Sequence, residues 1–417
     1  MYRMFPLPAA PLPRWLGGQE GLPVEFAETG QTVYLPMFRE SMLLLGQTGY
    51  AKTTLIQQYL DCRFLQQEDG LFTVILDVKQ DFRGCLRPGE RLVSFSPLPG
   101  SHTQFQWNLV RELRQSPDPE AALAQITDSL FADLSADRQN AFWVEAAKAV
   151  FMGHVRTILH CYSNNPSNAV LVRSLRGMGR QALREHLEKY GPNRWIVSYY
   201  LEDGAKRTGD ILAFAAAALQ KFSGLFCSET GTDTIHDFLD GQYGRRLLLA
   251  YDFSQSAASN AFFRILLRLI IQERLSQRVD RGKSVLLVLD EAPVLEGDFG
   301  LLHAATVCRG NRLQILLATQ SLEKMACLAP EKHGEALMHA CLAGFPVIAA
   351  FHPPGDASLD ILNRLFGSRP AVPLSRYDSP GVAQEPVVSS GELARMGIGE
   401  FYLKRGGDQP VRLKTIV

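Results

Sequence analysis

The sequence predicts an α/β fold that is interrupted by an all-helical insertion. Apolar runs of strand length recur before residue 108 and after residue 242, and several of them end in glycine or in acidic residues. Between these parts, apolar residues follow helical spacing without a strand-like run. We therefore expect one α/β domain built from residues 1–108 and 242–417, and an all-α domain built from residues 109–241. The Pro- and Gly-rich residues 1–30 are expected to form an extended lead on the surface.

Composition and charge limit the class of protein. The 417 residues include 43 Lys and Arg against 43 Asp and Glu, so an evenly basic surface is excluded, although a local basic channel is not. The seven cysteines show no C-x-x-C pair and no zinc spacing, so neither a disulfide framework nor a structural metal is indicated. No apolar run approaches the length of a membrane span, and no signal peptide is evident. We expect a cytoplasmic protein that can dock on a membrane complex.

A glycine-rich turn follows the apolar run 43–45 and leads into a Lys-Thr pair. Glycines let backbone N–H groups converge on an anion, Lys52 supplies a positive charge, and the Thr53 hydroxyl can ligate Mg²⁺. A helix expected from Lys52 would point the positive end of its dipole at the phosphates. The sequence therefore predicts a nucleotide-binding loop made of Gly46, Gln47, Thr48, Gly49, Tyr50, Ala51, Lys52, Thr53 and Thr54.

One position of this loop departs from the usual G-x-x-x-x-G-K-[ST] pattern. Ala51 stands where the last glycine is expected. If the loop needs a positive φ at that position, alanine is strained there. The alternative interpretation is an ordinary strand-to-helix turn that binds no ligand, although Lys-Thr rarely follows a strand and a turn by chance.

A second motif lies at the end of the apolar run 284–289, which is followed by Asp290 and Glu291. In a nucleotide hydrolase the first carboxylate holds Mg²⁺, through water, together with the Thr53 hydroxyl, and the second polarises the attacking water. A strand that ends in Asp-Glu is a weak signal alone. It becomes a strong one when a phosphate loop precedes it in the same chain.

A third segment comprises Arg309 and, eleven residues later, Gln320. An arginine just before the strand 313–319 can reach the γ-phosphate of a neighbouring subunit, and Gln320 at the end of that strand could sense hydrolysis. Arg312 competes with Arg309 for this role. A surface arginine and a capping glutamine are the alternative interpretations.

A helix expected over residues 169–190 carries four arginines with spacings that bring them roughly onto one face. Such a face could grip a phosphate backbone. A solvated surface stripe explains the same pattern at least as well. The candidate DNA-binding residues are Arg173, Arg176, Arg180 and Arg184.

Several segments in fixed order resemble the type IV secretion coupling proteins, the conjugative DNA-transfer ATPases related to the FtsK and HerA motors. The resemblance spans nearly all of the chain, and its most specific elements are the Asp-Glu strand end and the Arg-to-Gln-Ser spacing. After Asp-Glu, Ala292 and Pro293 replace the aromatic residue that is usual in the family. The family usually carries an N-terminal membrane anchor, whereas we expect no intrinsic membrane span in this sequence. The matching segments are 46–54, 76–81, 107–109, 142–147, 208–222, 289–291, 309–322 and 389–410.

This resemblance implies a RecA-like P-loop nucleotide-binding domain with an all-α domain inserted. It also implies a homo-hexameric ring that uses ATP and Mg²⁺ to pump DNA, or protein carrying DNA, toward a secretion channel, with a relaxase or channel components as partners. The roles carried over are Lys52 and Thr53 for phosphate and Mg²⁺, Asp290 for Mg²⁺, Glu291 as base, Arg309 as a finger acting across the subunit boundary, and Gln320 as sensor.

Two other functions fit the same motifs. A related FtsK- or HerA-like motor could serve chromosome segregation, DNA repair or phage defence. A nucleotide-gated adaptor could bind substrate proteins and turn over slowly, which the alanine at position 51 would favour.

Overall fold

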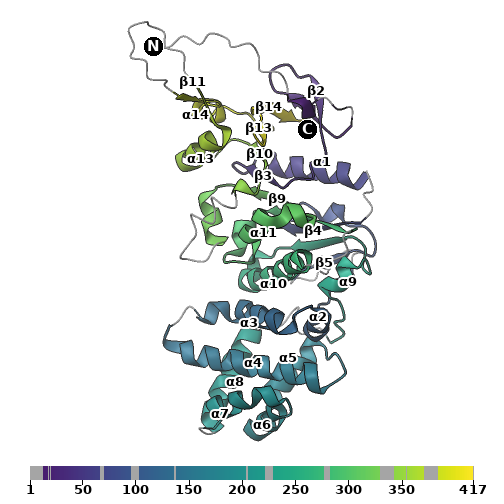
Figure 1. Cartoon of the computed structure of the whole chain (residues 1–417), viewed down its shortest axis with the longest axis vertical. Helices are drawn as coiled ribbons and strands as arrows, with labels where there is room; N and C mark the ends of the chain where they lie inside the picture. Colours follow the sequence, from purple (N-terminus) through teal and green to yellow (C-terminus); the bar gives the residue numbers. More distant parts are fainter. Residues whose placement is uncertain are drawn as a thin grey trace. The chain divides into compact units, whose positions relative to one another are not determined.

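The computed structural model describes most of the chain, and its contacts divide it into two compact units. The first unit comprises residues 1–76 and 281–417, and the second comprises residues 77–280. Figure 1 follows the chain from its N-terminus to its C-terminus through both units. The described residues are 13–16, 18, 20–65, 70–94, 103–135, 138–202, 205–220, 229–276, 282–328, 342–353, 355–370 and 384–416.

The first unit is built on a mixed sheet with the strand order β2-β1-β14-β13-β10-β3-β9-β8-β4. β10, β3, β9 and β8 are parallel neighbours, whereas β13, β14, β1 and β2 pair antiparallel at one side. β11 and β12 form a separate antiparallel pair. The strands are β1 Leu22–Phe26, β2 Thr32–Leu35, β3 Met42–Leu45, β4 Leu71–Asp77, β8 Ser284–Asp290, β9 Leu313–Thr319, β10 Val347–Ala350, β11 Ser368–Pro370, β12 Gln384–Pro386, β13 Glu400–Arg405 and β14 Val411–Thr415.

The central parallel strands of this unit are short, apolar and buried along almost their whole length. Such continuous apolar runs are typical of parallel strands that are covered on both faces. The register pairs Leu45 with Thr319 and Asp290 with Ala318, so β3, β8 and β9 end at the same edge. The residues that follow these strands are therefore brought together. Among the described residues, the α-helices of the unit are α1 Lys52–Leu65, α11 Leu301–Val307, α13 Asp356–Phe366 and α14 Ser390–Leu393.

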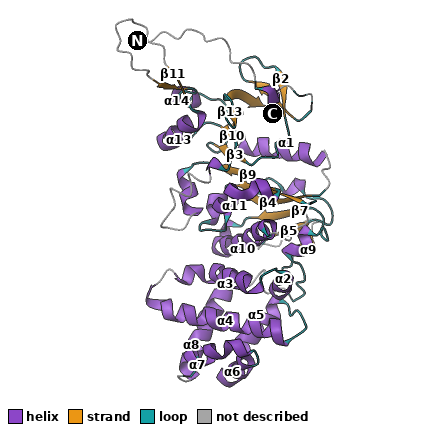
Figure 2. Cartoon of the chain, in the orientation of Figure 1, coloured by secondary structure: helices purple, strands orange, loops and turns teal. Residues whose placement is uncertain are grey.

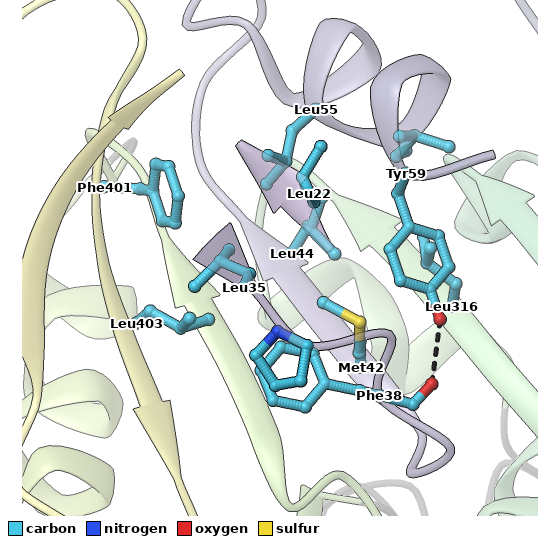
Figure 3. Close-up of a pocket in the computed structure, with 12 residues that line it drawn as sticks. Leu22, Leu35, Phe38, Met42, Leu44, Leu55, Tyr59, Leu316, Phe401 and Leu403 are labelled. Atoms are coloured by element: carbon cyan, nitrogen blue, oxygen red, sulfur yellow. Dashed lines mark hydrogen bonds between the residues drawn. The ribbon is translucent and has the colours of Figure 1, made fainter. Parts of the chain in front are cut away.

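The core beneath α1 shows how tightly the helix packs on the sheet. Leu55 and Tyr59 of α1 meet apolar side chains of the neighbouring strands, and the Tyr59 hydroxyl donates a 2.9 Å hydrogen bond to the Phe38 carbonyl (Figure 3). The gap left among these side chains has a volume of about 10 Å³, no more than one water molecule requires. It is a packing gap and not a ligand site.

The second unit combines three parallel strands with a group of helices. The strand order is β7-β5-β6, with β7 Arg246–Ala250, β5 Arg91–Val93 and β6 Thr103–Gln104. Figure 2 shows the helices α3 to α8 gathered without a strand between them. The helices are α2 Leu109–Gln115, α3 Pro119–Ser135, α4 Ala141–Cys161, α5 Asn168–Gly177, α6 Arg180–Glu188, α7 Arg194–Tyr200, α8 Ala205–Gln220, α9 Ile235–Leu239 and α10 Ser256–Leu275.

The chain enters and leaves the helical group through one polar joint. Residues 106–108 run beside residues 231–233, and the backbone N–H of Asn108 donates to the Asp233 carbonyl at 2.9 Å. The Asn108 side chain accepts from Arg111 N at 2.9 Å, which starts α2, and donates to the Gly231 carbonyl at 2.8 Å. Trp107 is fully buried here, and its ring packs edge-on against the Phe262 ring, with 5.5 Å between the ring centroids.

Most expected elements have the expected type, and the α/β fold with a helical insertion is confirmed. The predicted domain boundaries at residues 108 and 242 differ from the division into compact units and stay a prediction. One helix prediction is wrong. Residues 169–190 form two helices and not one, because the chain leaves the helical conformation at Met178 and Gly179. Gly177 and Gly179 have low helix propensity, which explains the break.

The expected N-terminal lead is described only in part. Residues 1–12 lie outside the described residues, whereas β1 lies inside the predicted lead and pairs antiparallel with β14 and β2. Among the described helices, none combines the length and the apolar character that a membrane span requires.

Candidate functional site

The predicted phosphate loop joins β3 to α1 in the first unit. Gly46 and Gly49 have φ values of +155° and +89°, which suit glycine and turn the backbone sharply. A Cβ on Gly46 would lie 2.6 Å from Phe351 Cβ, so no larger residue fits at that position. Gly46 N donates to the Thr319 carbonyl at 3.2 Å, which ties the start of the loop to β9.

Lys52 is the first residue of α1 and its side chain is buried. Its Nζ donates to the Gly46 carbonyl and, at 2.7 Å, to the Gln47 carbonyl. The ammonium therefore closes the loop from inside by binding the carbonyls of the loop's first two residues. A bound phosphate would meet this ammonium and the positive end of the α1 dipole together.

Ala51 adopts the left-handed conformation that the sequence pattern led us to consider. Its φ is +68°, the region in which the Cβ of a non-glycine residue is crowded. The cost is about 1–2 kcal/mol relative to an ordinary conformation. The surrounding contacts must therefore hold the loop in this shape.

Asp290 and Thr53 meet at the edge where β3 and β8 end. The Thr53 Oγ1 lies 3.4 Å from the Asp290 Oδ2, and the Asp290 side chain is fully buried. A hydroxyl and a carboxylate oxygen are oxygen ligands of the kind that Mg²⁺ prefers. The donor set fits Mg²⁺ bound beside a phosphate loop.

Glu291 is the most unusual residue of the site. Its φ is +68° and its side chain is 8% exposed, yet neither carboxylate oxygen has a hydrogen-bond partner among the described residues. Burial raises its pKa, and the nearby Gln320 backbone N–H and the Lys52 ammonium oppose this shift. A buried carboxylate with a raised pKa and free lone pairs suits a general base.

The third predicted segment is brought to the same edge only in part. Gln320 directly follows β9, which lies between β3 and β8, and its side chain is half-buried. Arg309 belongs to the short helix Cys308–Asn311, but its side chain lies outside the described residues. Arg312 has a φ of +53° and an exposed side chain. The roles of these residues stay predictions.

None of the predicted site residues lies in or after β10, but the residues that follow this strand contact the phosphate loop. Gln47 N donates to the His352 carbonyl at 2.8 Å, and the Gln47 Nε2 donates to the Pro353 carbonyl at 3.4 Å. The His352 ring is stacked on the Tyr50 ring, with 4.6 Å between the ring centroids and 7° between the ring planes. The strand order was the missing signal, because β10 ends beside β3 only in the folded sheet.

The four candidate DNA-binding arginines are not on one helix face. Arg173 and Arg176 lie on α5, whereas Arg180 and Arg184 lie on α6. Each guanidinium has an internal contact: Arg173 with Glu229, Arg176 with the Ala216 carbonyl at 3.1 Å, Arg180 with the Leu201 carbonyl at 2.9 Å, and Arg184 with Glu188 at 3.6 Å. The four arginines do not share the helix face on which the DNA-binding prediction was based. Their DNA-binding role stays a prediction.

The parallel strands, the loop with its buried lysine and the acidic end of β8 define an α/β protein of the RecA-like, phosphate-loop class. The family model of the type IV secretion-system coupling protein DNA-binding domain matches residues 32–353. The chain therefore belongs to the type IV secretion-system coupling protein family. No curated protein sequence matches it.

Solved structures share this fold at low sequence identity. The unbound bacterial conjugative coupling protein TrwBdeltaN70 is 16% identical, with a TM-score of 0.71 over 96% of this chain and 91% of that one. The plasmid coupling protein TrwB in complex with ADP and Mg²⁺ has 16% identity and a TM-score of 0.68, over 92% of this chain and 88% of that one. VirB4 of Thermoanaerobacter pseudethanolicus has 14% identity and a TM-score of 0.57, over 96% of this chain and 98% of that one.

Proposed function

We propose that the chain is an ATP-hydrolysing motor that moves DNA, or protein attached to DNA, toward a type IV secretion channel. The observation that carries this proposal is the meeting of the phosphate loop with Asp290 and Glu291 at one edge of the sheet. The 3.4 Å approach of the Thr53 hydroxyl to Asp290 joins the two motifs within the first unit. The TrwB structures with ADP and Mg²⁺ and with an ATP analogue support nucleotide binding by relatives of this fold.

Each residue of the edge has a distinct part in this proposal. Lys52 would exchange its bonds to the Gly46 and Gln47 carbonyls for phosphate oxygens, while Thr53 and Asp290 would hold Mg²⁺. Glu291 would accept a proton from the attacking water, since its oxygens are unpaired among the described residues. Mg²⁺-ATP would supply the anhydride bond to be broken.

The proposed assembly is a homo-hexameric ring in which Arg309 of one subunit completes the site of its neighbour. Arg309 lies four residues before β9, and Gln320 lies one residue after it, so the same strand would link the finger to the sensor. The ring would receive DNA from a relaxase complex and pass it to channel components.

The first test measures ATP hydrolysis by the full chain with and without single- and double-stranded DNA. We expect DNA to stimulate hydrolysis and the Lys52→Ala variant to lose it. Mass photometry reports whether rings form. No turnover with either DNA, together with no assembly at high protein concentration, would contradict the proposal.

The strained conformation of Ala51 favours one alternative, a nucleotide-gated adaptor that turns over slowly. Nucleotide binding without measurable hydrolysis, and hydrolysis gained by Ala51→Gly, would support the adaptor instead of the motor.

A further inference from the structure

The phosphate loop has two halves that are held differently. Its first half is fixed by backbone bonds, from Gly46 N to Thr319 and from Gln47 N to His352. Its second half contains Gly49, around which a Cβ would meet nothing within 4 Å, and the strained Ala51. The second half therefore needs a contact that offsets the unfavourable backbone conformation.

Tyr50 provides that contact, because it lies between Gly49 and Ala51 and stacks on His352. The ring centroids are 4.6 Å apart and the planes differ by 7°. Both side chains are half-buried, so the stack also removes apolar ring surface from water. A residue next to Ala51 is thereby tied to a fixed point outside the loop.

His352 is a suitable fixed point. It lies two residues after β10, which is paired in parallel with β3, the strand that leads into the loop. Its carbonyl accepts from Gln47 N at 2.8 Å, and the preceding Phe351 stacks on Phe401 of β13 at 5.1 Å. His352 thus contacts both halves of the loop, the first by its backbone and the second by its ring.

The geometry points to His352 as a positioning residue that holds the alanine-containing phosphate loop in its nucleotide-receptive conformation by stacking on Tyr50. This inference rests on the proposed function, since it concerns the same nucleotide site. His352 contacts the loop through Tyr50 and Gln47, so it would act on the nucleotide through the loop. A glycine at position 51 would relax the loop's dependence on the stack, because glycine adopts a positive φ at little cost.

The test compares the full-length protein with His352→Ala, His352→Phe, Ala51→Gly and the double variant Ala51→Gly/His352→Ala. His303→Ala is the matched control, since His303 is an exposed histidine of α11 in the same unit. Two quantities are measured: amide hydrogen exchange of residues 46–52 without nucleotide, and the Kd of a fluorescent ADP analogue.

We expect His352→Ala to speed exchange in the loop about fivefold and to weaken binding about fivefold, with β8 exchange unchanged. His352→Phe keeps a flat ring and should stay within twofold of the unmodified protein. In the Ala51→Gly background, removal of His352 should weaken binding less than twofold.

If His352→Ala leaves the amide exchange of the loop unchanged, or binds the ADP analogue as tightly as the unmodified protein does, this inference is overturned and the proposed function is not. The inference would also be overturned if His352→Ala weakened binding as much in the Ala51→Gly background as it does in the unmodified protein. If the unmodified protein binds no nucleotide, the proposed function fails and this inference fails with it.

Discussion

Two buried glutamates, one in each unit, show how differently the fold treats the same side chain. Glu112 is 6% exposed and Glu291 is 8% exposed. Glu112 accepts hydrogen bonds from the Trp107 Nε1 at 2.8 Å and from Ile235 N at 2.7 Å. Glu291 has no hydrogen-bond partner among the described residues and sits in a left-handed backbone conformation.

The difference separates a structural carboxylate from a candidate catalytic one. Burial raises the pKa of both groups, so the pKa direction alone does not distinguish them. Hydrogen bonds do distinguish them, because Glu112 ties α2 to the start of α9 while the oxygens of Glu291 remain available to a ligand. Substituting each glutamate should therefore affect different properties.

The largest expected effect follows from Glu291→Gln. Hydrolysis should fall about 10²- to 10⁴-fold, because the amide cannot accept a proton, while nucleotide affinity stays within a few-fold. Stability should not fall, since the substitution breaks no described hydrogen bond of this side chain. Steady-state ATPase assays, ADP binding and denaturant unfolding measure the three quantities. A loss of more than about 1 kcal/mol in unfolding free energy would assign Glu291 a structural role.

The second prediction concerns the pH dependence that Glu112 gives to folding. Burial raises its pKa from 4.5 to about 7, against the opposing hydrogen bonds from Ile235 and Trp107. The folded protein therefore holds a proton that the unfolded chain releases between pH 4.5 and 7. The stability contributed by this proton is complete below pH 4.5 and is lost as pH rises through 7, by up to about 3 kcal/mol.

Glu112→Gln should flatten this dependence, as measured by denaturant unfolding at several pH values from 4.5 to 8. The variant should keep its nucleotide affinity, because the two glutamates lie in different units. Glu185→Gln, an exposed change on α6, should leave the pH profile as it is. Identical profiles for Glu112→Gln and the unmodified protein would show that Glu112 is ionised in the folded state.

The smallest effect is expected from Ala51→Gly. Relief of the left-handed strain should raise the unfolding free energy by about 0.5–1 kcal/mol after the larger entropy of glycine is subtracted. Ala149→Gly, in the middle of α4, is the matched control and should destabilise by about 1 kcal/mol. If both substitutions destabilise alike, the loop does not hold Ala51 at positive φ in solution.

Local pattern predicted much of the fold. The bounds of β8 and β9 agree with the expected ones, because continuous apolar runs and the polar residues that follow them mark these strands within a few positions. The break at Gly179 was missed because the spacing of the arginines continues across it. The contact between His352 and Tyr50 depends on which strands are neighbours, and residues so far apart in the sequence carry no local signal of this pairing.

The position of β3 has a consequence for how the protein is made. β3 lies between β9 and β10, and Leu43 pairs with Leu317 and Ile348, so both neighbours of this strand are translated roughly 270 to 310 residues later. At roughly 5–20 residues per second, this apolar strand leaves the ribosome on the order of 15–60 s before its partners. The phosphate loop that it carries can take its final shape only after β9 and β10 have been synthesised.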